Sequence, residues 1–400
     1  MSRISAISVN SFCKKLIFPA KMVKTIFAFF AVLLMVTQDA LSCTSAIIGA
    51  DMNPSGRPLL WKLRDTSTTD NKIEYVSPSE GCLGYVALFN ASDLNLEEAW
   101  MGMNEAGFAI MNTASYNIKD DDLPESEMDK EGFVMTEALK HCRTVDDFEE
   151  LLNRLPRPLG VEANFGVIDS HGDGAYFETN NHSFVKYDLK EAPDHVLVRT
   201  NYSHSGRKNE GYGYIREANA IECLKPYIAE RNVTPAALTE DLSRSFYHSL
   251  FDKDFLESGE RWIIDQDFMP RYKSTATIVI EGCKPQPHNL KATKDLVADE
   301  YIMWTGMGYP PCSQIIPVWC EKNGVDRQLR GWGPDGRSEM CETVKARRDE
   351  VFPFHWGNGD KYIDTSVLLN KEGTGYLQVL VPENLETYRI ISEKRDKKSN

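Results

Sequence analysis

Residues 39–67 read DALSCTSAIIGADMNPSGRPLLWKLRDTS, and a cysteine follows directly after the short small-residue segment that contains Ala40 and Ser42. An apolar leader ends just before this cysteine, so Cys43 becomes the first residue of the chain if the leader is removed. Three interpretations of Cys43 compete: a lipid anchor, a structural thiol, or a catalytic nucleophile that needs a free amine beside it. The residues downstream favour the third.

The leader has the composition of a secretory signal. Lys21 and Lys24 are positive, and residues 25–36 (TIFAFFAVLLMV) form an apolar run shorter than the about 20 residues that span a membrane. Ala40 and Ser42 provide the small residues of a cleavage site before Cys43. We therefore expect a signal peptide over residues 1–42 and a secreted or periplasmic protein, with an uncut membrane anchor as the alternative.

Charge and composition narrow the function classes for residues 43–400. The chain has 400 residues and a net charge of −14 at pH 7, which argues against nucleic acid or an anionic membrane as a partner. We find no linker and no internal repeat, so a single domain is expected. The cysteines are scattered without the spacing of a zinc site, and no metal or cofactor is expected. Cys312 and Cys320 are a candidate disulfide that the sequence leaves open.

The hydrophobic pattern predicts more strands than helices. Expected strands cover residues 43–49, 58–61, 85–90, 108–112, 165–169, 175–179, 195–200, 274–281, 302–305 and 315–319. Expected helices cover residues 133–142, 145–155, 214–229, 234–246, 338–350 and 384–394. Because the strands come in hairpins and the helices in separate groups, we predict an α+β fold with antiparallel sheet.

An N-terminal cysteine carries both a nucleophile and a base. The α-amine has a reference pKa of roughly 7.7–8.0, so part of it is unprotonated near neutrality and can take the thiol proton without a histidine. Such a thiolate needs a nearby positive group and donors for the developing oxyanion. Asp65, Asn201 and Arg271 lie near strand ends and are candidates, although Asn201 also fits a turn cap or a glycosylation sequon, and Arg271 a surface residue.

Five segments carry a family resemblance. CTSAIIGADMNPSGRPLLWKLRD (residues 43–65) resembles the start of N-terminal nucleophile (Ntn) hydrolases of the choloylglycine hydrolase, penicillin V acylase and isopenicillin N acyltransferase-like group. GMNEAGFAIMNTASYN, ANFGVIDSHGDGAYFE, VRTNYSHSG and PRYKSTATIVIEG follow in the family order. The resemblance implies a four-layer αββα sandwich. It also implies cleavage of a linear amide C–N bond in a small-molecule substrate, or acyl transfer to an amine.

The resemblance also implies roles for six residues. Cys43 would be the nucleophile and, through its amine, the base, while Asp65 would accept a hydrogen bond from that amine. Asn201 and Asn112 would donate to the oxyanion, and Arg271 would lie near the thiolate. Lys62 stands where bile-salt and penicillin V enzymes have arginine; it keeps the charge but lacks the planar fork, and Arg64 is an alternative for that place.

A second hypothesis belongs to another class of protein. A cysteine after a small residue also occurs in bacterial lipoprotein signals, although Ala40 replaces the aliphatic residue usual at that position. Cys43 would then be lipidated, and the chain would be a lipid-anchored surface binding protein with a degenerate hydrolase fold. Lipidation and thiol catalysis exclude each other, because the sulfur becomes a thioether.

Overall fold

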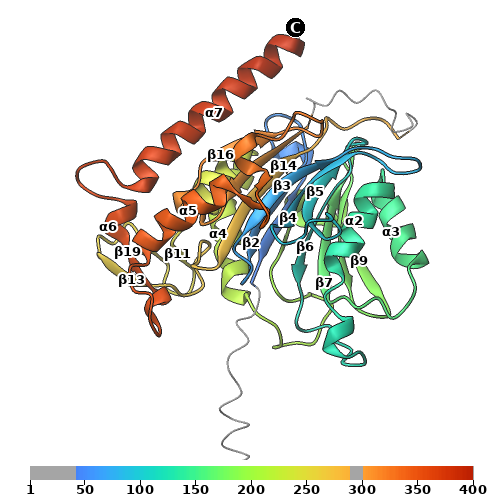
Figure 1. Ribbon diagram of the computed structural model, residues 1–400, viewed down its shortest axis with the longest axis horizontal. Coiled ribbons are helices and arrows are strands. Elements are labelled where there is room, and N and C mark those ends of the chain that lie inside the picture. Colours follow the sequence, from blue (N-terminus) through green and yellow to red (C-terminus); the bar gives the residue numbers. More distant parts are fainter. Residues whose placement is uncertain (1–41, 289–300, 400) are drawn as a thin grey trace, which may run out of the picture. The chain divides into compact units, whose positions relative to one another are not determined.

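The computed structural model describes residues 42–288 and 301–399 (Figure 1). The expected signal peptide lies outside the described residues except for Ser42. The described residues all belong to one unit, Leu41–Asn400. In this part of the chain, no helix combines the length and the hydropathy needed to cross a membrane.

Cys43 lies at the start of a six-stranded sheet, whose strand order is β10-β1-β2-β14-β15-β16. All neighbouring strands in it are antiparallel. The strands are β1 (Thr44–Ile48), β2 (Leu59–Asp65), β10 (Val196–Arg199), β14 (Ser274–Glu281), β15 (Ile302–Met307) and β16 (Ile315–Val318). β1, β2 and β14 are buried along their whole length, as expected for strands covered on both faces.

The second sheet has seven strands, which pair in sequence order from β3 to β9. The strands are β3 (Asn71–Val76), β4 (Tyr85–Asn90), β5 (Ala99–Asn104), β6 (Ala109–Ala114), β7 (Ala163–Ile168), β8 (Gly174–Thr179) and β9 (Phe184–Asp188). Side chains of both sheets, such as Ile47 and Leu60 from the first and Val86 and Met101 from the second, share one buried core. The two sheets therefore pack face to face.

Helices cover the outer face of each sheet. α2 (Glu131–His141) and α3 (Val145–Arg154) pack on the second sheet. α4 (Tyr214–Ala229), the π-helix η5 (Ala237–Leu242) and α7 (Tyr376–Ser399) pack on the first. This arrangement of helix, sheet, sheet and helix confirms the predicted α+β class and the four-layer αββα sandwich (Figure 1).

Short elements complete the described chain. Besides α5 (Glu339–Val351) and α6 (Thr365–Leu368), there are small two-stranded sheets of β11 (Tyr247–His248) with β12 (Lys253–Asp254), β13 (Trp262–Ile264) with β19 (Tyr362–Asp364), and β17 (Gly331–Trp332) with β18 (Arg337–Ser338). The 3-10 turns are η1 (Ala50–Met52), η2 (Glu125–Glu127), η3 (Leu189–Glu191), η4 (Pro193–His195), η7 (Pro310–Cys312), η8 (Arg327–Leu329) and η9 (Gly359–Lys361).

One predicted helix is wrong, and one cysteine pairing that the sequence left open is resolved. The helix expected over residues 234–246 is a short π-helix, because the N–H and the hydroxyl of Ser243 both donate to the Leu238 carbonyl, five residues earlier. Cys312 and Cys320, the candidate disulfide that the sequence left open, are free thiols. They lie before and after β16, and an extended strand between two cysteines holds their Cα atoms farther apart than the roughly 7 Å limit of a bridge.

Candidate active site

The pairing of β1 with β2 brings Cys43 to Asp65. The two strands are antiparallel, with Thr44 opposite Leu63 and Ser45 opposite Lys62, so the start of β1 lies beside the end of β2. The Cys43 thiol is 3.8 Å from the Asp65 carbonyl oxygen. Cys43 is 7% exposed with Ser42 still attached.

Asp65 is held by two residues at the start of the neighbouring strand. β14 pairs with β2 so that Ser274 stands opposite Asp65. The Ser274 hydroxyl donates to Asp65 Oδ1 at 2.5 Å, and the Arg271 guanidinium donates through Nε to Oδ2 at 3.1 Å. Burial lowers the pKa of Arg271, but the surrounding carboxylates, Asp65 foremost, together raise it above its ordinary value. Cys43, Asp65 and Arg271 therefore lie together.

Two guanidinium groups bind the carbonyl of the peptide bond that joins Ser42 to Cys43. Arg271 Nη2 donates to the Ser42 oxygen at 2.7 Å, and Arg216 Nη1 donates to the same oxygen at 3.1 Å. Both groups are cationic, so they stabilise negative charge on a carbonyl oxygen next to the thiol.

Arg216 was missed by the sequence analysis. It lies in the first turn of α4, and its Nη1 also donates to the Cys43 oxygen at 2.7 Å and to the Thr44 hydroxyl at 2.8 Å. Burial and the nearby charge of Arg271 lower its pKa to about 9. An arginine in an amphipathic helix ordinarily indicates a solvated face, and the Gly-Tyr-Gly turn before the helix is the only signal that sets this one apart.

Asn201 reaches the site through Arg216. Its side-chain oxygen accepts from Arg216 Nη2 at 2.8 Å, and its Nδ2 donates to the Ala114 carbonyl at 2.9 Å. A carboxamide nitrogen has two hydrogens, so one remains for a further acceptor. The residue forms an isolated bridge with Tyr212 just after β10, at the strand end where the sequence placed it.

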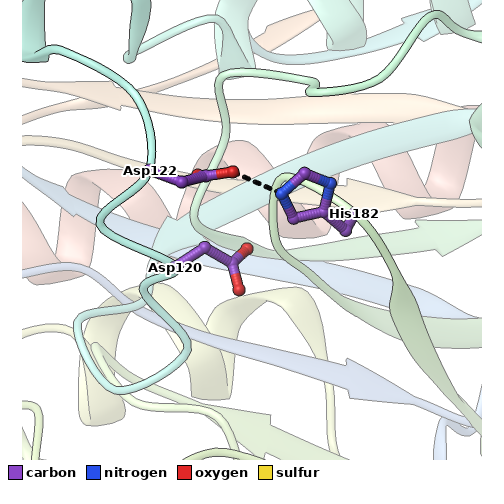
Figure 2. A group of neighbouring side chains, drawn as sticks. All are labelled: Asp120, Asp122 and His182. Atoms are coloured by element: carbon purple, nitrogen blue, oxygen red, sulfur yellow. Dashed lines mark hydrogen bonds and ion pairs between the residues drawn. The ribbon is translucent and has the colours of Figure 1, made fainter.

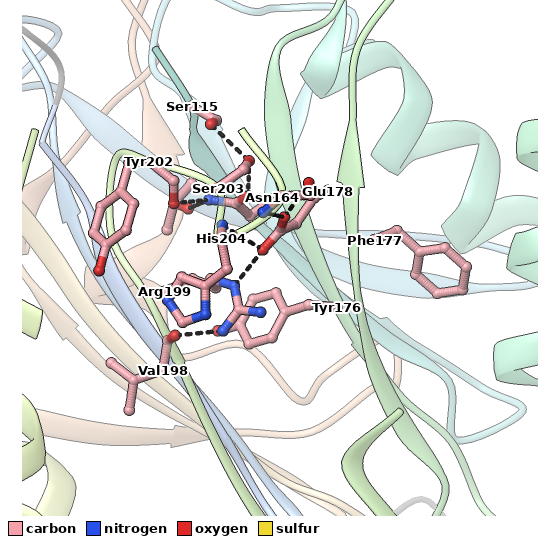
Figure 3. Close-up of polar contacts among 12 residues, drawn as sticks. Ser115, Asn164, Tyr176, Phe177, Glu178, Val198, Arg199, Tyr202, Ser203 and His204 are labelled. Carbon is pink, nitrogen blue, oxygen red and sulfur yellow. Dashed lines mark hydrogen bonds and ion pairs between the residues drawn. The ribbon is translucent and has the colours of Figure 1, made fainter. Parts of the chain in front are cut away.

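A network of buried polar side chains holds the segment that follows Asn201 (Figure 3). The Ser203 hydroxyl bonds both Ser115 at 2.7 Å and Asn164 at 2.6 Å. Glu178 accepts from Arg199 at 2.7 Å, which joins β8 of one sheet to β10 of the other. These contacts position residues 199–205 without touching Cys43.

Lys62 and Asn112 form a second group from facing sheets. Lys62 Nζ donates to Asn112 Oδ1 at 2.7 Å and to the Trp100 carbonyl at 2.8 Å. Burial lowers the pKa of Lys62 to about 8, although the Cys43 sulfur acts in the opposite direction. Because the Asn112 Oδ1 accepts a hydrogen bond from Lys62, the carboxamide is oriented with its Nδ2 pointing away from Lys62. This Nδ2 group can donate a hydrogen bond to another acceptor.

A possible cation cluster lies on the surface, apart from these residues. Asp120, Asp122 and His182 offer ligand atoms within 4.8 Å of one another (Figure 2). Their atoms already have partners: His182 Nε2 is 2.5 Å from Asp122, and Asp120 accepts from the Asn181 N–H at 3.1 Å. All three residues are exposed, and we assign no metal to them.

Comparison with known proteins gives one family match. Residues 67–233 match the family model "Acyl-coenzyme A:6-aminopenicillanic acid acyl-transferase". The predicted resemblance to the Ntn hydrolase group is confirmed. The matched segment includes Asn112 and Asn201 but begins after Cys43, Lys62 and Asp65, so the family match does not cover these three residues. No curated protein matches.

Three solved structures are similar at low identity. An N-acylethanolamine-hydrolyzing acid amidase ortholog from Caenorhabditis elegans is 13% identical, with a TM-score of 0.41, covering 62% of this chain and 94% of its own. A variant conjugated bile acid hydrolase from Clostridium perfringens is 11% identical, with a TM-score of 0.41 and coverages of 72% and 94%. Penicillin V acylase from Agrobacterium tumefaciens is 13% identical, with a TM-score of 0.36 and coverages of 69% and 86%.

Proposed function

We propose that the chain is a secreted cysteine amidohydrolase or acyltransferase that cleaves a linear amide through a thioester on Cys43. The observation that carries this proposal is the position of Arg271. Its guanidinium joins the Asp65 carboxylate to a carbonyl oxygen directly beside the thiol. A nucleophile, an acceptor for its amine and a cationic donor to a carbonyl are the components that amide attack needs.

The reaction follows from these groups once Cys43 is the first residue. The α-amine of Cys43 takes the thiol proton, and the sulfur attacks the amide carbon while the carbonyl oxygen becomes an oxyanion. Asn201 and Asn112 donate to this oxygen through their Nδ2 groups. The C–N bond then breaks, the amine leaves with the proton that the base held, and the acyl group remains as a thioester.

Water or an acceptor amine completes the cycle. It attacks the thioester carbon and loses a proton to the Cys43 amine, and the sulfur leaves as the thiolate. Because both nucleophiles attack the same intermediate, the choice between hydrolysis and acyl transfer is made by which one reaches it. Asp65 holds the α-amine in place throughout as a hydrogen-bond acceptor.

Loss of the Cys43 sulfur is the direct test. We expect Cys43→Ala to abolish release of the amine from a panel of N-acyl amino acids, N-acyl ethanolamides and conjugated bile acids, measured with and without an added amine acceptor. Cys82→Ala serves as the control, because Cys82 is a free, half-buried cysteine whose backbone bonds to Ser79 within its own turn. Full activity of Cys43→Ala would refute the mechanism.

The mass of the mature N-terminus tests the maturation step separately. Export with cleavage before Cys43 predicts a protein that begins with unmodified cysteine. A diacylglyceryl mass increment on that cysteine would instead support the lipid-anchored binding protein, because the modified sulfur cannot attack a carbonyl.

A further inference from the structure

A cavity of about 1180 Å³ lies beside the edge strand β10, where helix α4 and the segment that follows β9 also line it. Ligand-binding clefts typically measure roughly 300–1000 Å³, so a small organic molecule fits inside. The described residues of its lining include neither Cys43 nor its neighbours Asp65, Arg216 and Arg271. The cavity is therefore separate from the candidate active site, and the proposed reaction does not use it.

One face of α4 forms an apolar wall of this cavity. Residues 217, 221, 224 and 228 follow one another at the spacing that places them on the same face of a helix, and all of them line the cavity. Ile221 is 41% exposed, so the rest of the chain does not fully cover this face. Further apolar side chains of the lining come from η1 and β10: Met52, Val196 and Val198. The face runs for about 16 Å along the helix, which suits a ligand with an elongated apolar body.

Glu217 provides the polar end of this face. It is 8% exposed, and its Oε1 lies 2.7 Å from His204 Nε2. Burial and the charge of Arg199 lower the pKa of His204, so this imidazole is neutral near pH 7 and supplies no positive charge. Among the residues that the structure describes, no lysine or arginine forms an ion pair with the Glu217 carboxylate. Burial raises the pKa of Glu217 to about 7, which Arg199 opposes and Glu178 favours.

The cations that line the same cavity already have carboxylate partners. Each of them forms an ion pair: Lys186 with Glu149 at 2.8 Å, Arg199 with Glu178 at 2.7 Å, Lys225 with Glu222 at 2.5 Å, and Arg231 with Asp51 at 3.5 Å. Of the acidic residues in the described lining, Glu217 is the buried one. A buried carboxylate without a cation is costly, because it loses its hydration without compensation. The charge that this cavity lacks is therefore positive.

We propose that the cavity binds a protonated apolar amine, whose ammonium group donates to Glu217 while its apolar body lies along the face of α4 that carries Ile221. An ammonium group has three N–H donors, and its hydrogen bond to a carboxylate is charge-assisted. An anionic ligand would instead add a second negative charge beside Glu217. Because the site lies apart from Cys43, this inference goes beyond the proposed function and does not depend on it.

Three ligands with the same alkyl chain test the charge of the site. Octylammonium, octanol and octanoate differ in the charge of the head group, and isothermal titration calorimetry at pH 8 measures their dissociation constants for the wild-type protein. Octylammonium should bind about tenfold or more tightly than either of the others, the gain expected for one charge-assisted hydrogen bond. Binding of octylammonium that is no tighter than that of octanol would overturn the proposal.

Glu217→Gln removes the negative charge and keeps a side-chain oxygen beside His204. We expect this variant to bind the three ligands with similar affinity. Glu230→Gln is the matched control, because Glu230 is an exposed carboxylate at the C-terminal cap of the same helix and outside the cavity lining. It should keep the wild-type preference.

A preference for octylammonium that persists in Glu217→Gln would show that the amine binds elsewhere, and it would refute the proposal. Neither result bears on amide cleavage at Cys43, which is measured with the amide panel. Failure of this proposal and failure of the proposed function are therefore distinguishable.

The pH dependence of wild-type binding provides a second readout that needs no variant. The charged or titratable groups that act on Glu217 are those of His204, Arg199, Glu178 and Tyr176. With its pKa of about 7, Glu217 is largely protonated at pH 6 and ionised at pH 8, while an alkylamine stays protonated at both. Protonation of His204 at lower pH acts in the same direction, because a positive imidazole competes with the ligand for the carboxylate.

We therefore expect octylammonium to bind about tenfold more tightly at pH 8 than at pH 6, whereas the affinity for octanol changes little. Equal affinity for octylammonium at the two pH values would contradict the proposal even if Glu217→Gln fails to fold.

Discussion

Burial of Lys62 makes the free energy of unfolding vary with pH in the alkaline range. Its pKa is about 8 in the fold and 10.5 in an unfolded chain, chiefly because of burial. Between these values the unfolded chain binds more protons, so the free energy of unfolding rises with pH. The penalty for burying the charged amine is present in full below pH 8 and disappears by about pH 10.5.

We therefore expect the stability of the wild type to increase relative to Lys62→Met as the pH rises from 7 to 10. The change should be up to about 3 kcal/mol, the free energy that corresponds to the pKa difference. Urea unfolding of both proteins at pH 7, 8.5 and 10 measures it. Parallel pH profiles for the two proteins would contradict this expectation, because they would show that the pKa of Lys62 is the same in the folded and the unfolded chain.

Arg216 is expected to act by positioning. Arg216→Gln removes the donors to the Cys43 carbonyl and to the Asn201 side-chain oxygen. We expect kcat to fall about tenfold or more, because the two residues are then less well oriented for the reaction. KM should change little, because Arg216 itself does not bind the substrate. Arg231→Gln is the control, because Arg231 is an exposed arginine just beyond the end of α4. A rise in KM with unchanged kcat would indicate that Arg216 binds substrate instead.

At this scale the sequence predicted residues that the structure brings together with Cys43 better than it predicted the residues that hold them in place. Cys43, Asp65 and Arg271 could be found because an N-terminal thiol needs an acceptor and a cation near strand ends. Arg216 could not be found, because an arginine in a helix has the same pattern whether it faces a site or a surface.

The turn before α4 controls the placement of Arg216. Gly213 has a φ of +94°, and a Cβ there would lie 2.4 Å from Arg216 Nη2 and 2.7 Å from the Thr200 hydroxyl. Both the backbone conformation and the close approach therefore favour glycine.

Gly213→Ala should lower the free energy of unfolding by about 1–3 kcal/mol and reduce kcat together with it. Gly259→Ala is a matched control: its φ is +74°, but nothing lies within 4 Å of the added Cβ. Thermal unfolding and kcat of both variants provide the measurement. Equal losses of activity in the two variants would show that backbone strain alone is responsible.

β2 shows why an element boundary was misjudged. The sequence predicted a strand over residues 58–61, which ends before the charged Lys-Leu-Arg-Asp segment. The strand continues to Asp65, and these charged residues are buried between the sheets or against β14. Hydrophobic patterning locates strands by their apolar face, and it fails where that face carries a polar site.

At the scale of the whole molecule, the layer order could be predicted while the contacts across the layers could not. Hairpins of strands and separate helices indicated sheets covered by helices, and the family resemblance specified four layers. The pairing of Lys62 with Asn112 depends on how one sheet lies over the other. That alignment arises from the packing of the buried core between them, for which a single sequence contains no periodic signal.

The carbonyl of Ser42 has a consequence for the timing of activity. While its bond to Cys43 is intact, this oxygen takes donors from both Arg271 and Arg216, and the amine that the thiol needs does not exist. Under the proposed function the precursor is a latent form, in which the Ser42 carbonyl uses donors that lie beside the thiol. On that proposal, a cell that makes such a chain would keep the amide-cleaving thiol inactive until the leader is removed.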